Sequence, residues 1–309
     1  MNEICAVSCR QLNKSYGNVV ALRDISCDVG KGELFGIIGP DGAGKTTLFR
    51  ILVTLITADS GTASVDGLDV VRKFEKIRTC VGYMPGRFSL YQDMTVEENL
   101  TFFAAVFGTT IRENYDLIKD IYQPIEPFKH RRAGKLSGGM KQKLALSCAL
   151  IHKPSVLFLD EPTTGVDPVS RKEFWGMLRR LKAQGITILV STPYMDEATL
   201  CDRIALMRDG QFLQIDTPQQ MVRQFGKTLW AVSADRMSKL LADLHRMPEV
   251  KSCFAFGSTH HITVDDGRLT VESLKIRLTE LSHTSVEIQP IEATIEDCFM
   301  GNGELRMEN

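Results

Sequence analysis

The sequence predicts an α/β fold with a mainly parallel core sheet, followed by a smaller C-terminal α/β domain. From about residue 5 to residue 225, short apolar runs alternate with segments of helical periodicity. This pattern is typical of parallel strands connected by helices. After residue 226 the order changes to strand–helix–strand–strand–helix–strand. We therefore predict two domains, residues 1–226 and residues 227–309.

The composition excludes several classes of protein. With 37 basic and 38 acidic residues, the chain carries a net charge of −1, so we expect no nucleic-acid partner. Its eight cysteines form no CxxC pair, which indicates free thiols rather than a metal site. The first residues lack the basic and apolar regions of a signal peptide. No apolar run approaches the ~20 residues of a membrane span, so we expect any membrane role to depend on another subunit.

The elements of the first domain can be predicted in order. Residues 6–17 and 23–33 are bounded by the turn signals Gly17 and Gly30–Gly32, and predict antiparallel strands. Short apolar runs predict buried parallel strands at residues 34–38, 156–160 and 186–190. Apolar residues at helical spacing predict helices over residues 45–55, 141–151 and 170–185, the last with Gly185 at its C-cap.

The second domain has the strand and helix order of a ferredoxin-like α/β sandwich. Its helices are predicted over residues 235–247 and 270–281. The first strand of this domain is predicted to begin at Leu229. Three further strands are predicted over residues 251–257, 260–265 and 285–291. His260 and His261 stand side by side in this domain. We interpret them as packing or solvated residues rather than as metal ligands.

The strongest functional signal follows the strand at residues 34–38. Gly39, Gly44, Lys45 and Thr46 fit the pattern G-x-x-x-x-G-K-[ST] between a strand and a helix. Glycines allow successive backbone N–H groups to point at one anion, and the helix N-terminus adds positive charge. We expect Lys45 to reach the β- and γ-phosphates of a nucleotide and Thr46 to bind Mg²⁺. Asp41 is unusual here, because a carboxylate near a triphosphate should repel it unless the side chain points to solvent. The predicted nucleotide-binding residues of this loop are Gly39, Pro40, Asp41, Gly42, Ala43, Gly44, Lys45, Thr46 and Thr47.

Two carboxylates end the apolar strand at residues 156–160. Asp160 stands where a strand-end carboxylate can hold Mg²⁺ through water. Glu161 is the candidate base that polarises the attacking water. The alternative is a pair that caps a helix, and the phosphate loop upstream favours the catalytic interpretation.

A second anion-binding helix N-terminus begins at Leu136-Ser137-Gly138-Gly139. One nucleotide site does not require two such helices. In this combination the chain resembles the ATP-binding domains of ABC transporters over about residues 5 to 225. The resemblance implies a P-loop NTPase fold of ABC type, with an antiparallel β subdomain and a helical subdomain, that binds ATP and Mg²⁺.

The same resemblance implies that two nucleotide domains close head to tail. Ser137, Gly138 and Gly139 would then contact the γ-phosphate bound to the partner domain. Asp167 would lie in the loop at the dimer seam. Tyr16 would stack on adenine, although taken alone it would more often be a packing residue.

Two segments resemble the ABC-2 type exporters, a subgroup that includes multidrug efflux systems. One is the stretch at residues 86–108, and the other is the C-terminal segment ending at residues 292–300. This implies membrane-spanning ABC-2 type permease subunits as partners and a cytoplasmic location on the inner face of the cell membrane. It also implies that residues 88–99 contact a short helix of the permease. Ordinary surface packing is the alternative for Phe88 and Tyr91.

Two positions depart from the family pattern. Pro193 stands where the family has a histidine that donates to the γ-phosphate, and Gly86 replaces a glutamine that touches Mg²⁺ and water. Proline and glycine supply no such side-chain group. We therefore expect nucleotide binding to survive and hydrolysis to be slow, as in one half of an asymmetric dimer with a different ABC ATPase. An active homodimer, in which Glu161 suffices, is the competing hypothesis.

Two further functions are alternatives to an exporter subunit. A regulatory ABC partner that does not hydrolyse ATP would share the fold and differ only in turnover. Soluble ABC ATPases that act on ribosomes have two nucleotide domains and a basic linker, and those that act on DNA have a long coiled-coil insertion. Neither feature is present in these 309 residues, so the sequence favours the exporter subunit.

Overall fold

The structure is a computed structural model that describes residues 5–265 and 267–304. The chain divides into two compact units, Met1–Thr217 and Pro218–Asn309. The sequence predicts the boundary after Gly226, whereas this division assigns the helix α7 (Pro218–Gln224) to the second unit. The reason lies in packing, because α7 contacts α10 (Ile295–Glu304) of that unit.

The first unit is organised around a six-stranded sheet of order β10-β9-β3-β8-β7-β6. The pairs between β9 and β6 are parallel, and β10 is an antiparallel edge strand. The strands are β3 (Leu34–Ile38), β6 (Val81–Met84), β7 (Val156–Asp160), β8 (Thr187–Thr192), β9 (Arg203–Arg208) and β10 (Gln211–Asp216). Every residue of β3, β7 and β8 is buried, which confirms the three predicted parallel strands.

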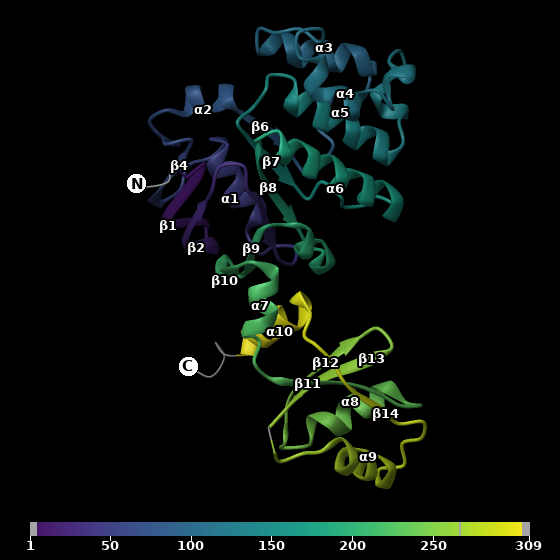
Figure 1. The fold of residues 1–309 in the computed structure, drawn as a ribbon. Coiled ribbons are helices and arrows are strands. Elements are labelled where there is room, and N and C mark those ends of the chain that lie inside the picture. The colour runs from purple at the N-terminus through teal and green to yellow at the C-terminus, as the bar shows by residue number, and fades with distance from the viewer. Residues whose placement is uncertain (1–4, 266, 305–309) are drawn as a thin grey trace. The chain divides into compact units, whose positions relative to one another are not determined.

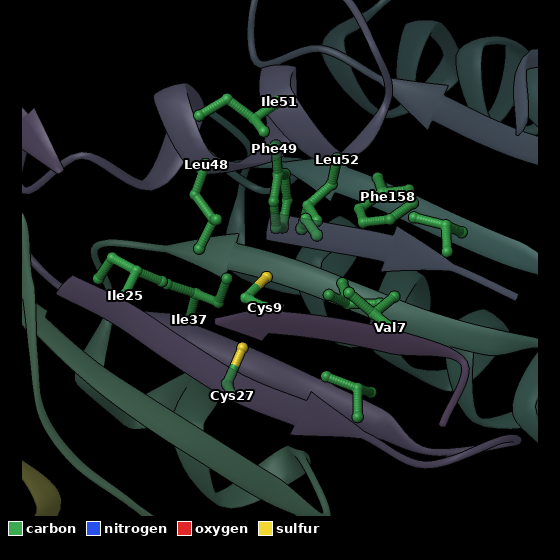
Figure 2. Close-up of a cluster of buried hydrophobic side chains, with 14 of the residues drawn as sticks. Val7, Cys9, Ile25, Cys27, Ile37, Leu48, Phe49, Ile51, Leu52 and Phe158 are labelled. Atoms are coloured by element: carbon green, nitrogen blue, oxygen red, sulfur yellow. The ribbon is translucent and has the colours of Figure 1, made fainter. Parts of the chain in front are cut away.

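A second, antiparallel sheet has the order β2-β1-β4-β5. Its strands are β1 (Val7–Tyr16), β2 (Val19–Val29), β4 (Ser60–Val65) and β5 (Leu68–Asp69). The predicted turn is confirmed, because Gly17 adopts φ 57° between β1 and β2. Helix α1 (Lys45–Leu52) directs Leu48, Phe49 and Leu52 into the core beside this sheet (Figure 2).

The remaining helices of the first unit follow the apolar pattern of the sequence. They are α2 (Phe74–Cys80), α3 (Val96–Val106), α4 (Tyr115–Tyr122), α5 (Gly138–Leu150) and α6 (Pro168–Ala183), with 3-10 turns at Glu126–Phe128, Ala133–Lys135 and Met195–Leu200 (η3). Helices α3 and α4 both pack on α5, and the three form a helical cluster (Figure 1). Gly185 at φ 89° follows α6 and confirms the predicted C-terminus.

The second unit contains a four-stranded antiparallel sheet of order β12-β13-β11-β14. Its elements are β11 (Thr228–Ser233), α8 (Met237–His245), β12 (Val250–Phe256), β13 (Thr259–Val264), α9 (Val271–Glu280) and β14 (Glu287–Pro290). This is the predicted order of elements, and the first strand lies between the third and the fourth as in a ferredoxin-like sheet. Within the described residues, no helix of either unit is both long and apolar enough to cross a bilayer.

The side chains of His260 and His261 both make contacts within the second unit. His260 Nε2 hydrogen-bonds to the Met237 carbonyl, and His261 pairs with Asp297 at 2.8 Å. Both histidines therefore have internal partners. No disulfide links any two of the eight cysteines in the described residues.

Replacement of Phe49 by alanine should lower the free energy of unfolding of the first unit by about 3–5 kcal/mol, the usual cost of removing a buried ring. Phe49 is fully buried and meets the Phe158 ring edge-on at 5.5 Å between centroids. Urea unfolding followed by circular dichroism measures the change. The matched control is Val71→Ala, at an exposed position, which should change stability by about 0.5 kcal/mol or less.

Candidate functional site

The phosphate loop lies between β3 and α1 and depends on two glycines that leave no room for a side chain. A Cβ at Gly39 would collide with the Met207 carbonyl oxygen, and a Cβ at Gly44 would collide with that of Ala21. Gly44 also adopts φ 104° at the N-cap of α1, a conformation that strains any residue with a Cβ. The loop begins where Gly39 N donates to the Thr192 carbonyl at the end of β8. Asp41 is exposed.

Lys45 is almost completely buried at the first turn of α1, with 3% of its surface exposed. Its ammonium donates to the carbonyls of Gly39 and Pro40 at 2.8 and 2.9 Å. It also lies 3.0 Å from the Glu161 carboxylate. A buried ammonium is stable only when it is paired and hydrogen-bonded, and these three oxygens provide that. An incoming phosphate would meet a cation already aimed into the loop.

The two predicted carboxylates are brought to this loop by the pairing of β7 with β8. Asp160 is opposite Ser191 in the sheet register, and the Ser191 hydroxyl donates to Asp160 Oδ1 at 2.6 Å. Burial, with the neighbouring Asp160 carboxylate second, raises the pKa of Tyr83 to about 12. A neutral phenol therefore stands beside a carboxylate that is itself 2% exposed.

Glu161 adopts a left-handed backbone conformation, with φ 49°. Its backbone N–H donates to both oxygens of Ser191, each at 3.0 Å. Such conformations in residues with a Cβ cost energy and are concentrated at functional sites. Here the conformation turns the carboxylate toward Lys45 immediately after the strand ends.

The segment after β8 contains a buried network that the sequence does not reveal. The Glu197 carboxylate, in η3, is 2% exposed and accepts hydrogen bonds from Thr163 and Thr192 at 3.1 and 2.5 Å. Arg171 from α6 completes it at 3.0 Å and stacks its guanidinium 4.3 Å from the Tyr194 ring centroid. The only hint in the sequence is the cluster of acidic residues after Pro193, which on its own indicates a helix start.

The first of the two departures from the family pattern, Gly86, lies against the backbone of the carboxylate strand. A Cβ at Gly86 would stand 3.0 Å from the Asp160 carbonyl oxygen. This is closer than nearly all real Cβ contacts, so any larger residue requires the backbone to shift by a few tenths of an ångström.

Helix α5 begins at the predicted Leu136-Ser137-Gly138-Gly139 motif. Ser137 is the N-cap of α5, and its hydroxyl accepts a hydrogen bond from Met140 N at 3.4 Å. Asp167 is the N-cap of α6, where its carboxylate accepts from Ser170 N at 3.0 Å. The hydrogen bond from the Ser170 backbone lowers the pKa of Asp167. Gly139 lies close to Ser170, since a Cβ there would be 2.8 Å from its hydroxyl oxygen.

Tyr16 ends β1 with 47% of its surface exposed. The Lys14 ammonium lies 5.6 Å from its ring centroid. A large exposed aromatic ring at a strand end is available for stacking, as a nucleobase would require.

The oxygen donors near the phosphate loop fit a magnesium ion whose coordination is completed by substrate phosphates and water. The described residues contain no group of three or more histidine, cysteine, aspartate or glutamate side chains that could hold a metal. Mg²⁺ is usually held by one or two protein oxygens together with waters and substrate phosphates. The Thr46 hydroxyl and the Asp160 carboxylate are oxygens of that kind.

Comparison with known proteins adds the following. Residues 22–164 match the family model described as ABC transporter. The chain is 41% identical over 235 residues to a probable multidrug ABC transporter ATP-binding protein of Escherichia coli, YbhF, a match that covers 74% of the chain but only 40% of that relative. It is 35% identical over 305 residues to the daunorubicin resistance ATP-binding protein DrrA2 of Streptomyces coeruleorubidus, covering 94% of the chain and 90% of the relative.

Among solved structures, the chain is similar to cbiO1 of Clostridium perfringens, described as part of an ABC transporter complex. The TM-score is 0.64 at 27% identity, over 72% of this chain and 94% of that one. This similarity, with the parallel sheet, the antiparallel sheet and the helical cluster, confirms the predicted ABC-type fold.

Replacement of Glu197 by alanine should destabilise the first unit by about 3 kcal/mol, because it leaves Arg171 without its buried partner and two hydroxyls without an acceptor. The free energy of unfolding in urea measures the loss. Asp196 provides the control, since its side chain is 75% exposed and Asp196→Ala should cost less than about 1 kcal/mol. Equal effects of the two substitutions would contradict the network.

Proposed function

The chain belongs to the ABC transporter family, and we propose that it is the ATP-binding and ATP-hydrolysing subunit of an exporter. The observation that carries this proposal is the placement of Lys45. Its buried ammonium points into the phosphate loop and lies 3.0 Å from Glu161 at the end of β7. Phosphate binding and water activation therefore share one site, as ATP hydrolysis requires.

In the proposed reaction, the loop residues 39–47 surround the β- and γ-phosphates and Tyr16 stacks on the adenine. The phosphates compete with Glu161 for the Lys45 ammonium, which frees the carboxylate to accept a proton from the attacking water. Ser191 holds the backbone of Glu161 in place. Mg²⁺, held by Thr46 and Asp160, would supply charge neutralisation at the phosphates.

We propose that a second ABC ATPase domain completes the site. Ser137, Gly138 and Gly139 stand at the N-terminus of α5, where free backbone N–H groups attract the γ-phosphate of a partner domain. Asp167, already fixed as the N-cap of α6, would lie at the seam between the two domains. The partner is a different chain in the asymmetric arrangement and a second copy in the homodimer.

The asymmetric arrangement is supported by Pro193 and Gly86. Both positions lack the polar side chain that the family pattern places there, while the phosphate loop and Glu161 are intact. Loss of one preorganised donor lowers the rate by about 10²–10³-fold. We therefore propose that this chain mostly holds ATP and that the partner's site turns over.

We further propose ABC-2 type permease subunits as membrane partners, with the chain bound at the inner face of the cell membrane. Similarity to ATP-binding proteins named for multidrug transport and daunorubicin resistance supports export. We propose a contact with the permease at residues 88–99. There Tyr91 is 50% exposed and its ring centroid lies 5.1 Å from that of Phe102.

The purified chain should bind Mg·ATP with micromolar affinity and hydrolyse it little faster than Glu161→Gln does. Equilibrium binding of a fluorescent ATP analogue and release of inorganic phosphate measure the two quantities. Lys45→Ala should abolish binding and serves as the control for the loop. Turnover far above the Glu161→Gln blank would favour the active homodimer, and absence of binding would overturn the proposed function.

Restoring the side chain at position 193 should raise turnover. Pro193→His should increase kcat by about 10²-fold, the size of the effect of one transition-state donor, and should leave ATP affinity within a factor of about three. The double variant with Gly86→Gln should gain less than the two effects combined, because residue 86 is crowded by Asp160. An unchanged kcat in Pro193→His would refute our account of the slow site.

A further inference from the structure

A cavity of about 560 Å³ lies in the first unit between the segment after β6, α3 and α5. This volume is in the range of pockets that hold drug-sized molecules, about 300–1,000 Å³. The phosphate-loop residues do not line it. It is therefore separate from the nucleotide loop, although Gly86 and Glu161 form part of its wall.

The cavity exists because one face of α5 carries small side chains. Ala145, Cys148 and Ala149 recur at helical spacing on the lining face. Opposite them, the lining includes three half-buried aromatic rings, those of Phe88, Phe103 and Phe107. Flat aromatic walls around an open volume favour a flat apolar body, because such rings prefer to stack or to meet edge to face.

Two cations line the cavity, Arg78 and Lys141, and Lys141 is the one whose charged group has neither an acidic partner nor a hydrogen bond among the described residues. Lys141 lies in the first turn of α5, and its ammonium is 5.4 Å from the Phe88 ring centroid. No carboxylate in the described part of the chain lies within ion-pair distance of it. Arg78 is bonded to the hydroxyl and the carbonyl of Thr54, and Glu161 is neutralised by Lys45. An anionic group in the cavity would therefore be attracted to Lys141.

A second polar feature lies on the wall at His152. Its ring stacks on Phe107 with centroids 3.8 Å apart, and Nε2 is 3.0 Å from the Val81 carbonyl. Because a carbonyl only accepts, Nε2 carries the proton, and burial lowers the pKa of His152 so that the ring stays neutral. Nδ1 is then a buried acceptor with no partner among the described residues.

We propose that this cavity binds an amphipathic aromatic anion. Its flat apolar body lies among Phe88, Phe103 and Phe107, and its acidic group faces Lys141. Such a ligand rests against Glu161 and Gly86, so its binding and that of the nucleotide would be thermodynamically linked.

Anilinonaphthalene sulfonate is a suitable probe, since it combines a flat aromatic body with a sulfonate. Titration of the purified full chain, followed by probe fluorescence, should show one saturable site per chain. Lys141→Met should weaken binding by roughly 10-fold or more, the loss expected for a charge-assisted contact. The matched control is Lys143→Met on the same helix. Lys143 pairs with Glu173 at 2.9 Å and does not line the cavity, so this control should leave the dissociation constant unchanged.

Two further measurements keep the test independent of any one variant. The uncharged analogue N-phenylnaphthylamine should bind the unmodified chain roughly 10-fold more weakly than the sulfonate, and Ala145→Phe should abolish binding of both probes by filling the cavity. Saturating Mg·ATP should leave the sulfonate bound. Equal effects of Lys141→Met and Lys143→Met, equal affinity of the two probes, or complete displacement by Mg·ATP would each overturn the proposal.

Discussion

The buried Lys45 ammonium is the constraint on which the rest of the site depends. A charge with 3% exposure must be surrounded by oxygens. Two of these are carbonyls of its own loop, and the third is the carboxylate of Glu161. The loop belongs to β3 and the carboxylate to β7, so the pair can form only if β8 lies between these strands and all three end at the same edge of the sheet. This ion pair therefore depends on the side-by-side arrangement of β3, β8 and β7.

The same edge explains why the neighbouring side chains take their positions. Parallel pairing puts Ser191 opposite Asp160, and Ser191 then holds both the Asp160 side chain and the Glu161 backbone. The next residue of β8, Thr192, accepts a hydrogen bond from the first glycine of the phosphate loop and donates to Glu197. Arg171 extends the network to α6, whose N-cap is Asp167. A displacement at the end of β8 would therefore change the positions of the phosphate loop, of the Asp160 and Glu161 carboxylates and of the first turn of α6.

The fold and the motifs were predictable because they are local. Buried apolar runs identified β3, β7 and β8, and the glycine spacing identified the phosphate loop. The Leu136-Ser137-Gly138-Gly139 motif identified the start of α5. The Glu197 network was not predictable, because its partners Thr163, Arg171 and Thr192 lie up to 34 residues away from Glu197 in sequence. Threonine and arginine are also common on protein surfaces, so their residue types give no sign of a buried network. The cavity was also hidden, since small residues on α5 predict close helix packing as readily as a hollow.

In the proposed function, Gly86 and Pro193 affect turnover rather than nucleotide binding. The groups that would grip the phosphates come from one continuous segment, residues 39–47, whose conformation is set by its own glycines and by Met207 and Ala21. The groups that would act on the attacking water come from the ends of separate strands, β6, β7 and β8, and Gly86 and Pro193 follow two of these. A change at those two positions can therefore remove contacts to the reacting atoms while the loop, Lys45 and the N-terminus of α5 keep their geometry. In the proposed asymmetric arrangement, the chain would keep its own nucleotide and still present Ser137 to a partner, because these two tasks depend on different elements of the fold.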